Sequence, residues 1–174
     1  MEDVYLGKQF QPITPANMDN KIKYQIGDAT EPRGKGSKII VHICNDIGAW
    51  GKGFVMALSR KWKKPEAEYR KWFKERKGFA LGEVQFVEVE NDLFIANLLG
   101  QRGITATDSR PPIRYEAVET GLIKVAEKAV ELSASIHMPR IGSGLAGGKW
   151  EEIEKIINKT LVNRGLSVTV YDLE

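Results

Sequence analysis

The sequence predicts an α/β protein in which helices cover both faces of a mixed central sheet. Segments with strand-like and helix-like patterns alternate through most of the chain, as they do in α/β proteins. Two of the strand-like segments are short, continuous apolar runs, which is typical of strands buried on both faces. One neighbouring pair is separated by Asn91-Asp92, a turn signal that predicts an antiparallel hairpin. At 174 residues, the chain has the length of one domain with a full hydrophobic core.

The first half of the chain is predicted to form two strands and then two helices. Residues 21–25 (KIKYQ) have strand-like composition and end at a Gly-Asp pair. After a loop rich in Gly and Pro, residues 37–44 (SKIIVHIC) form the first continuous apolar run. Residues 52–62 and 65–76 have helical patterns, and Pro65 fits the first turn of the second helix.

A hairpin, a long loop and a long helix are predicted next. Residues 81–91 alternate apolar and polar side chains, and residues 92–99 complete the hairpin. Residues 100–112 form a long irregular segment, and loops of that length are often functional. A long helix is predicted after this segment, because apolar residues recur at steps of four and three and so form one helical face. These residues are Val118, Leu122, Val125, Ala129 and Leu132.

The chain ends with a strand, a helix and a strand. Residues 135–141 (SIHMPRI) are the second buried run, residues 149–161 have a helical pattern, and residues 166–173 (LSVTVYDL) are rich in β-branched residues.

Composition excludes several classes of protein and site. Cys44 is the only cysteine, so an internal disulfide is impossible and a reducing compartment is expected. His42 and His137 are far apart in sequence, and Cys44 has no ligand-spaced partner, so no metal site is predicted. Neither a membrane span nor a signal-peptide pattern is present. We therefore expect a cytoplasmic protein that has no membrane partner. The net charge of +3 is too small to indicate DNA binding by itself.

A glycine-rich turn lies between the second buried strand and the helix that follows it. Its glycines are Gly142, Gly144, Gly147 and Gly148. In α/β proteins, ligands bind beyond the carboxyl ends of the strands. Glycines at that place let several N–H groups approach a phosphate or diphosphate near a helix N-terminus. The pattern matches neither a P-loop nor the Rossmann fingerprint. The alternative is that these glycines serve the turn alone.

A second glycine-rich turn follows the first buried strand, through Gly48, Gly51 and Gly53. Two such turns in one domain could hold two parts of an extended ligand. Asn45 and Asp46 stand between strand and turn and are suited to sugar hydroxyls. The alternative is that both side chains cap N–H groups of the turn. His42 is either a functional histidine or a buried structural one, and His137 is expected to be structural. Asp28, directly after the first strand, could receive the amino group of a base.

Six segments, taken in order, resemble a macrodomain. They are IGDAT, VHICNDIGAWGKGFVMAL, IANLLGQ, IRYEA, HMPRIGSGLAGGKWE and VTVYDL. The resemblance covers residues 21–174 and is nearest to the branch that contains the yeast ADP-ribose 1''-phosphate phosphatase and the terminal ADP-ribose protein glycohydrolase. It implies a three-layer α/β/α macrodomain. Residues 1–20 then form an N-terminal extension or an edge strand.

The resemblance also implies an ADP-ribose site without a cofactor. Asp28 would receive the adenine amino group, the loop from Ser143 to Gly147 would wrap the diphosphate, and Asn45 would contact the distal ribose. Tyr171 is implied as a residue that packs on the adenine. The complete set of expected ligand-binding residues is Asp28, Ala29, Asn45, Gly51, Lys52, Gly53, Phe54, Gln101, Ser143, Gly144, Leu145, Ala146, Gly147 and Tyr171.

The resemblance leaves several activities open. The glycohydrolase uses a lysine and an aspartate, but the matching positions here are Gly100 or Gln101, and Ala146. The phosphatase has a histidine where this chain has His42, so we expect His42 and Asp46 to be catalytic residues of an ADP-ribose 1''-phosphate phosphatase. The alternatives are an ADP-ribosyl or acyl hydrolase that uses an activated water, and a non-catalytic reader of ADP-ribose. ADP-ribosylated macromolecules are further expected partners.

Overall fold

The computed structural model describes residues 20–107 and 109–174, so the predictions made for residues 1–19 lie outside the described residues. The strands are β1 (Lys23–Ile26), β2 (Lys38–Asn45), β3 (Val84–Glu90), β4 (Leu93–Gln101), β5 (Ser135–Met138) and β6 (Val168–Asp172). The helices are α3 (Phe54–Lys61), α4 (Lys64–Glu75), α5 (Tyr115–Leu132) and α6 (Trp150–Thr160), followed by the short 3-10 helix η1 (Val162–Arg164).

The strands form one mixed sheet in the order β1-β6-β5-β2-β4-β3. Each neighbouring pair is parallel except β3 and β4, which form the antiparallel hairpin predicted from the sequence. Asp92, in the turn of that hairpin, has a positive φ of 61°, a conformation that Asp tolerates better than most residues. Because five strands run the same way, their carboxyl ends lie along one edge of the sheet, where ligands bind in α/β proteins.

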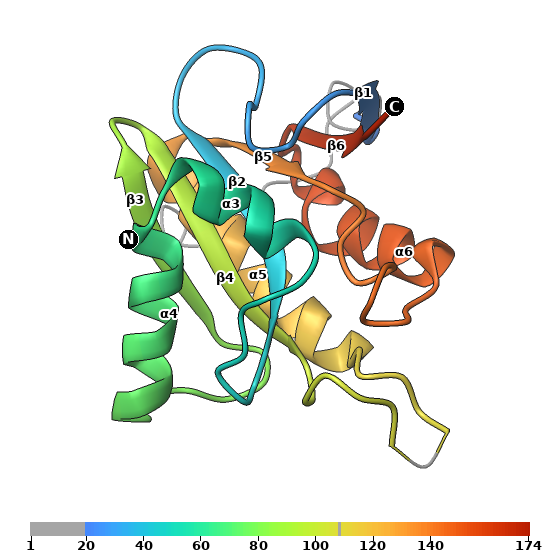
Figure 1. Ribbon diagram of the computed structural model, residues 1–174. Helices are drawn as coiled ribbons and strands as arrows, with labels where there is room; N and C mark the ends of the chain where they lie inside the picture. The colour runs from blue at the N-terminus through green and yellow to red at the C-terminus, as the bar shows by residue number, and fades with distance from the viewer. Residues whose placement is uncertain (1–19, 108) are drawn as a thin grey trace, which may run out of the picture.

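Helices cover both faces of the sheet, as predicted, so the fold has three layers (Figure 1). On one face, α5 and α6 pack through Leu122 and Ile153 against Ile39 of β2 and Ile136 of β5. On the other face, α3 and α4 enclose a smaller cluster that contains Ile40, Leu58 and Tyr69. Alternate residues of β2 therefore belong to different cores, which explains its unbroken apolar sequence.

Strand β5 is shorter than the sequence predicted. The apolar run continues to Ile141, but the strand ends at Met138. Pro139 has no N–H to donate to a neighbouring strand, and its carbonyl accepts a hydrogen bond from the N–H of Ile141 (2.7 Å) instead. This early end turns the chain out of the sheet, and the glycine-rich segment begins there.

None of the helices in the described part of the chain is long and apolar enough to cross a membrane.

Candidate functional site

A cleft of about 270 Å³ lies beyond the carboxyl ends of β2, β4 and β5. It separates the turn that enters α3 from the glycine-rich segment that follows β5. Eight of the residues predicted from the sequence line it: His42, Lys52, Gly53, Phe54, Gln101, Gly144, Leu145 and Ala146. The other lining residues include Arg140 and Gly142. The structure therefore brings together the two glycine-rich turns that the sequence separates by some ninety residues.

The remaining predicted residues lie outside the lining of this cleft. They are Asp28, Ala29, Asn45, Asp46, Gly51, Ser143, Gly147 and Tyr171.

The glycine-rich segment is held by its own backbone and by the loop before α5. The N–H of Gly148 donates to the carbonyl of Gly142 (2.7 Å), and the N–H of Ile113 donates to the carbonyl of Ala146 (3.1 Å). A Cβ on Gly148 would lie 2.4 Å from that Gly142 oxygen, and Gly142 itself has a φ of +73°. Glycine is therefore required at both positions for the turn itself.

The turn after β2 is organised by the Asn45 side chain. Its Oδ1 accepts hydrogen bonds from the N–H groups of Ile47 and Ala49 (both 3.0 Å) and from the Tyr69 hydroxyl (2.8 Å), while Nδ2 donates to the Ala49 carbonyl (2.7 Å). These contacts are those of a turn-capping asparagine. In this structure Asn45 shapes the loop that bounds the cleft.

Asp46 connects this turn to the end of β4. Its carboxylate accepts a hydrogen bond from the N–H of Gly103 (2.7 Å), and its own N–H donates to the carbonyl of Gln101 (3.1 Å). The Gln101 side chain in turn donates to the Gly103 carbonyl (3.0 Å). The loop that begins at Gln101 is thus fastened beside the cleft by one carboxylate.

His42 has only 2% of its surface exposed. Its ring lies between Trp50 and Phe54, with Nε2 2.5 Å from Asn97 Oδ1. The Asn97 amide nitrogen donates to the backbone carbonyl of Pro65 and to the side-chain Oε1 of Gln85. Asn97 Oδ1 is therefore the acceptor, so the network assigns the proton to His42 Nε2. Burial lowers the pKa of His42 to about 4, although the Asn97 contact opposes that shift. The imidazole is therefore neutral at pH 7, and its environment is that of a buried structural histidine.

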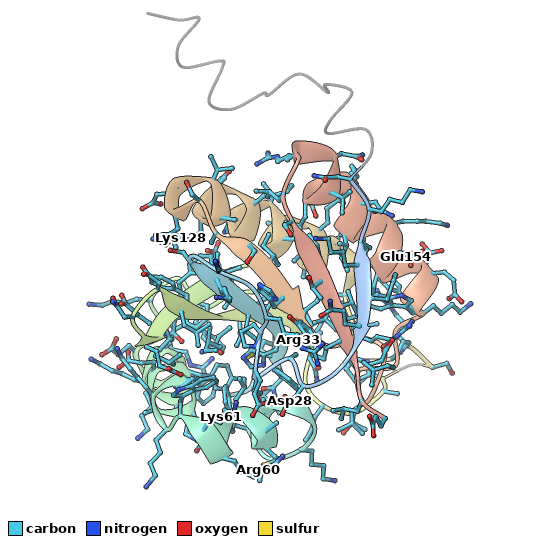
Figure 2. The ribbon with its side chains drawn as sticks, turned by 90° about the horizontal axis from the view of Figure 1, so that it is seen from above. Asp28, Arg33, Arg60, Lys61, Lys128 and Glu154 are labelled. Carbon is cyan, nitrogen blue, oxygen red and sulfur yellow. The ribbon has the colours of Figure 1, made fainter. Side chains whose placement is uncertain are left out.

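Asp28 lies after β1 beside the end of α3, as Figure 2 shows with Arg60 and Lys61. Asp28 Oδ1 accepts two hydrogen bonds from Thr30, one from its backbone N–H (2.8 Å) and one from its hydroxyl (2.7 Å). Oδ2 can therefore accept a hydrogen bond from a ligand. Partial burial acts to raise the pKa of Asp28, but the Thr30 hydrogen bonds and the charges of Lys61 and Arg60 outweigh it, so the pKa is lowered. Asp28 is an anion at neutral pH.

The Tyr171 ring lies against the turn that precedes Asp28. A Cβ added to Gly27 would be 3.4 Å from this ring. Its hydroxyl accepts a hydrogen bond from the N–H of Arg33 (3.0 Å) and contacts His137 Nδ1 (2.8 Å). Only 3% of Tyr171 is exposed, which leaves little ring surface for a ligand. Burial also lowers the pKa of His137 to about 4, consistent with the structural place expected for it.

Arg140 is a cleft residue that sequence reasoning did not select. Its Nε and Nη2 donate to the two carboxylate oxygens of Asp172 (2.6 and 3.0 Å), and its guanidinium lies 5.2 Å from the ring centres of both Tyr24 and Trp150. The hydrogen bond to Asp172 raises the pKa of Arg140. Its position within MPRIGSG was the available signal, since the residue precedes the glycines directly.

No group of three or more His, Cys, Asp or Glu side chains within residues 20–107 and 109–174 is arranged to hold a metal ion.

Comparison with known proteins identifies the family. The fold superposes on that of a macrodomain protein from Streptomyces coelicolor with a TM-score of 0.79 and 52% sequence identity, over 87% of this chain and 99% of the other. The chain belongs to the macrodomain family. No family model matches it, so this membership depends on the relatives and on the fold. The resemblance inferred from the motifs is confirmed, together with the three-layer architecture.

Two kinds of curated protein are similar in sequence to this chain. The zebrafish (Danio rerio) chromodomain-helicase-DNA-binding protein 1-like is 31% identical over 159 residues, which is 86% of this chain but only 15% of that protein. The chain thus spans only 15% of the length of that relative and 17% of the length of the mouse (Mus musculus) protein of the same name. The ADP-ribose 1''-phosphate phosphatase of Saccharomyces cerevisiae is 24% identical over 179 residues, covering 88% of this chain and 99% of the enzyme.

Proposed function

We propose that this macrodomain binds ADP-ribose in the cleft between residues 51–54 and 139–146. The observation that carries the proposal is the meeting of two glycine-rich turns at the carboxyl ends of β2 and β5, with Lys52 and Arg140 in the lining. A diphosphate needs backbone N–H groups at close approach and a positive surrounding. The glycine-rich segment would supply the N–H groups, and Lys52 and Arg140 would supply the positive charge without a metal.

The proposed orientation of the ligand in the cleft depends on the position of Asp28. The adenine lies at the carboxyl end of β1, where Asp28 Oδ2 accepts its amino group beside Ala29. The diphosphate lies along Ser143–Gly147, and the distal ribose reaches Gln101 and the 51–54 turn. Asn45 supports the turn after β2 through the hydrogen bonds that it accepts from Ile47 and Ala49, and Tyr171 supports the segment after Asp28 through the one that it accepts from Arg33.

We further propose that the reaction is removal of phosphate from ADP-ribose 1''-phosphate. Water attacks the phosphorus, the bond from phosphorus to the ribose oxygen breaks, and ADP-ribose and inorganic phosphate leave. The similarity to a phosphatase over nearly the whole of that enzyme supports this reaction. His42 and Asp46 are its proposed residues. At neutral pH His42 is uncharged, so its proposed role is to accept a proton from the attacking water, although a pKa near 4 makes it a weak base.

A second candidate is a reader that binds ADP-ribose without hydrolysis. The burial of His42 and the hydrogen bond between Asp46 and the N–H of Gly103 favour it, since both proposed catalytic groups already have structural partners. The same cleft serves either function.

Calorimetric titration with ADP-ribose tests the binding proposal, and phosphate release from ADP-ribose 1''-phosphate by the same preparation tests the reaction. We expect binding together with release. His42→Gln should then abolish release and leave the affinity within about threefold, whereas the control His137→Gln, at the other buried histidine, should leave both unchanged. Binding without release would select the reader. Absence of binding would overturn the proposal altogether.

A further inference from the structure

Positive charge in this protein is concentrated in one stretch of the chain, which runs from the end of α3 through α4 to the turn after it. Residues 60–78 contain nine Lys and Arg against three Glu, a net charge of +6. The whole chain has 26 basic and 23 acidic residues, a net charge of +3, so the rest of the chain has a net charge of −3. We call the nine basic residues of this segment the α4 basic surface: Arg60, Lys61, Lys63, Lys64, Arg70, Lys71, Lys74, Arg76 and Lys77.

Few of these charges are neutralised by neighbours. Within the described part of the chain, only Lys61 and Arg70 of the nine pair with a carboxylate, Glu31 and Glu66 respectively. Lys64 donates to the backbone carbonyl of Glu88 (3.0 Å). One or two basic residues in a last turn would suffice to offset the helix dipole. Among the described residues, seven of the nine side chains of the α4 basic surface therefore have no carboxylate partner.

The lysines of α4 lie on its exposed face. Lys64, Lys71 and Lys74 are exposed, while Pro65 and Tyr69 are buried against the sheet. The spacing from Lys64 to Lys74 is ten residues, or about 15 Å of helix, which matches about four successive phosphates of one nucleic acid strand.

The α4 basic surface adjoins the wall of the cleft. Arg70 donates to the carbonyls of Gly48 (3.2 Å) and Trp50 (3.3 Å), and a Cβ on Gly48 would meet the Phe73 ring at 2.4 Å. Helix α4 thus packs directly on the loop that leads into the 51–54 turn. In Figure 1 the carboxyl end of α4 lies at the same edge of the molecule as the carboxyl ends of β2 and β4.

We propose that the α4 basic surface is a docking surface for the phosphodiester backbone of a nucleic acid. A row of lysines with few partners binds such a backbone by displacing its counterions, without reading sequence. A membrane surface fits less well, because a membrane-binding helix exposes large apolar residues beside its lysines. Among the described residues, none of the exposed large hydrophobic side chains belongs to residues 57–80. A bound strand would lie beside the mouth of the cleft.

The test is fluorescence anisotropy of a labelled 20-nucleotide oligodeoxythymidylate titrated with the full chain at several salt concentrations. We expect binding that weakens steeply with salt. Lys71→Ala/Lys74→Ala should weaken it about tenfold at low salt. It should also reduce the slope of log K against log salt by about 1.4, because each lost phosphate contact to a single strand accounts for about 0.7.

The matched control is Lys155→Ala/Lys159→Ala, which removes the same charge from α6 on the opposite side of the sheet. It should leave the affinity and the slope unchanged. The inference would be overturned by no binding, by equal losses in the two variants, or by equally strong binding of polyglutamate to the unaltered chain in a competition experiment.

Titration of both variants with ADP-ribose separates this inference from the proposed function, since neither lysine pair lines the cleft. If the unaltered chain bound the oligonucleotide but not ADP-ribose, the proposed function would be contradicted and the docking surface would still be supported.

Discussion

At the scale of single residues, the buried histidines make stability depend on pH. The pKa of His42 is lowered from 6.5 to about 4 by burial, so the unfolded chain binds a proton that the folded chain excludes between those values. The stabilisation is complete above pH 6.5 and is lost as the pH falls towards 4. Each such histidine contributes a slope of up to about 1.4 kcal/mol per pH unit. His137, also lowered to about 4, contributes in the same way.

We therefore predict that His42→Gln lowers the pH dependence of the free energy of unfolding between pH 6 and pH 4.5 by up to about 1.4 kcal/mol per pH unit. Urea unfolding of both proteins across that range measures the effect, and His137→Gln should give a similar reduction. An unchanged slope for His42→Gln would mean that His42 titrates near its ordinary pKa. It would then be accessible to water, which would strengthen its proposed catalytic role.

Residue types near the cleft could be predicted from the sequence, but not the direction of each side chain. Asn45 and Asp46 were assigned both to a ligand and to turn capping, and a short amide or carboxylate satisfies either geometry equally well. The hydrogen bonds to Ala49 and Gly103 become visible only when the loops are placed. Arg140 was missed because its partner Asp172 lies 32 residues away in sequence.

At the scale of elements, two glycines of the glycine-rich segment are expected to differ in their importance for stability. Gly148→Ala would place a methyl group 2.4 Å from the Gly142 carbonyl oxygen, so the backbone must move. At Gly144 an added Cβ meets nothing within 4 Å. We predict that Gly148→Ala lowers the free energy of unfolding by about 2 kcal/mol, whereas Gly144→Ala changes it by less than about 0.5 kcal/mol.

Urea unfolding of the two variants measures this difference. Equal stabilities would mean that the turn relaxes freely around residue 148. Such a loop would be too soft to present its N–H groups in a fixed arrangement.

The helices and the buried strands were predictable because burial leaves a period in the sequence. Leu122 and Val125 mark the inner face of α5, and the unbroken run of β2 reflects its two cores. The order of the strands was not predictable in this way. The pairing of β1 with β6, with Tyr24 opposite Val170, joins the two ends of the described chain and has no local signal.

At the scale of the whole molecule, strand order decides how long a ligand the site can hold. In the order β1-β6-β5-β2, two strands separate the carboxyl end of β1, which precedes Asp28, from that of β2. At about 4.8 Å per strand the two ends are roughly 14 Å apart. A base at one end and a ribose at the other therefore need a linker of about that length, for which the diphosphate of the proposed ligand, above β5 and its glycine-rich segment, is suited. The length of the proposed ligand is set by the sheet.

This separation predicts that the two ends of the site respond to different fragments of the ligand. Asp28→Asn replaces the free acceptor Oδ2 by an amide that donates, so it should weaken both AMP and ADP-ribose by about ten- to a hundredfold, the usual loss for a hydrogen bond to a charged group. Lys52→Ala, in the turn at the other end, should weaken ADP-ribose and leave AMP unchanged. Calorimetric titration of each variant with both ligands measures the pattern. Glu31→Gln removes a nearby exposed charge as the control. If AMP bound equally well to Asp28→Asn, the adenine would lie away from β1, and the ligand would have to cross the sheet edge in another direction.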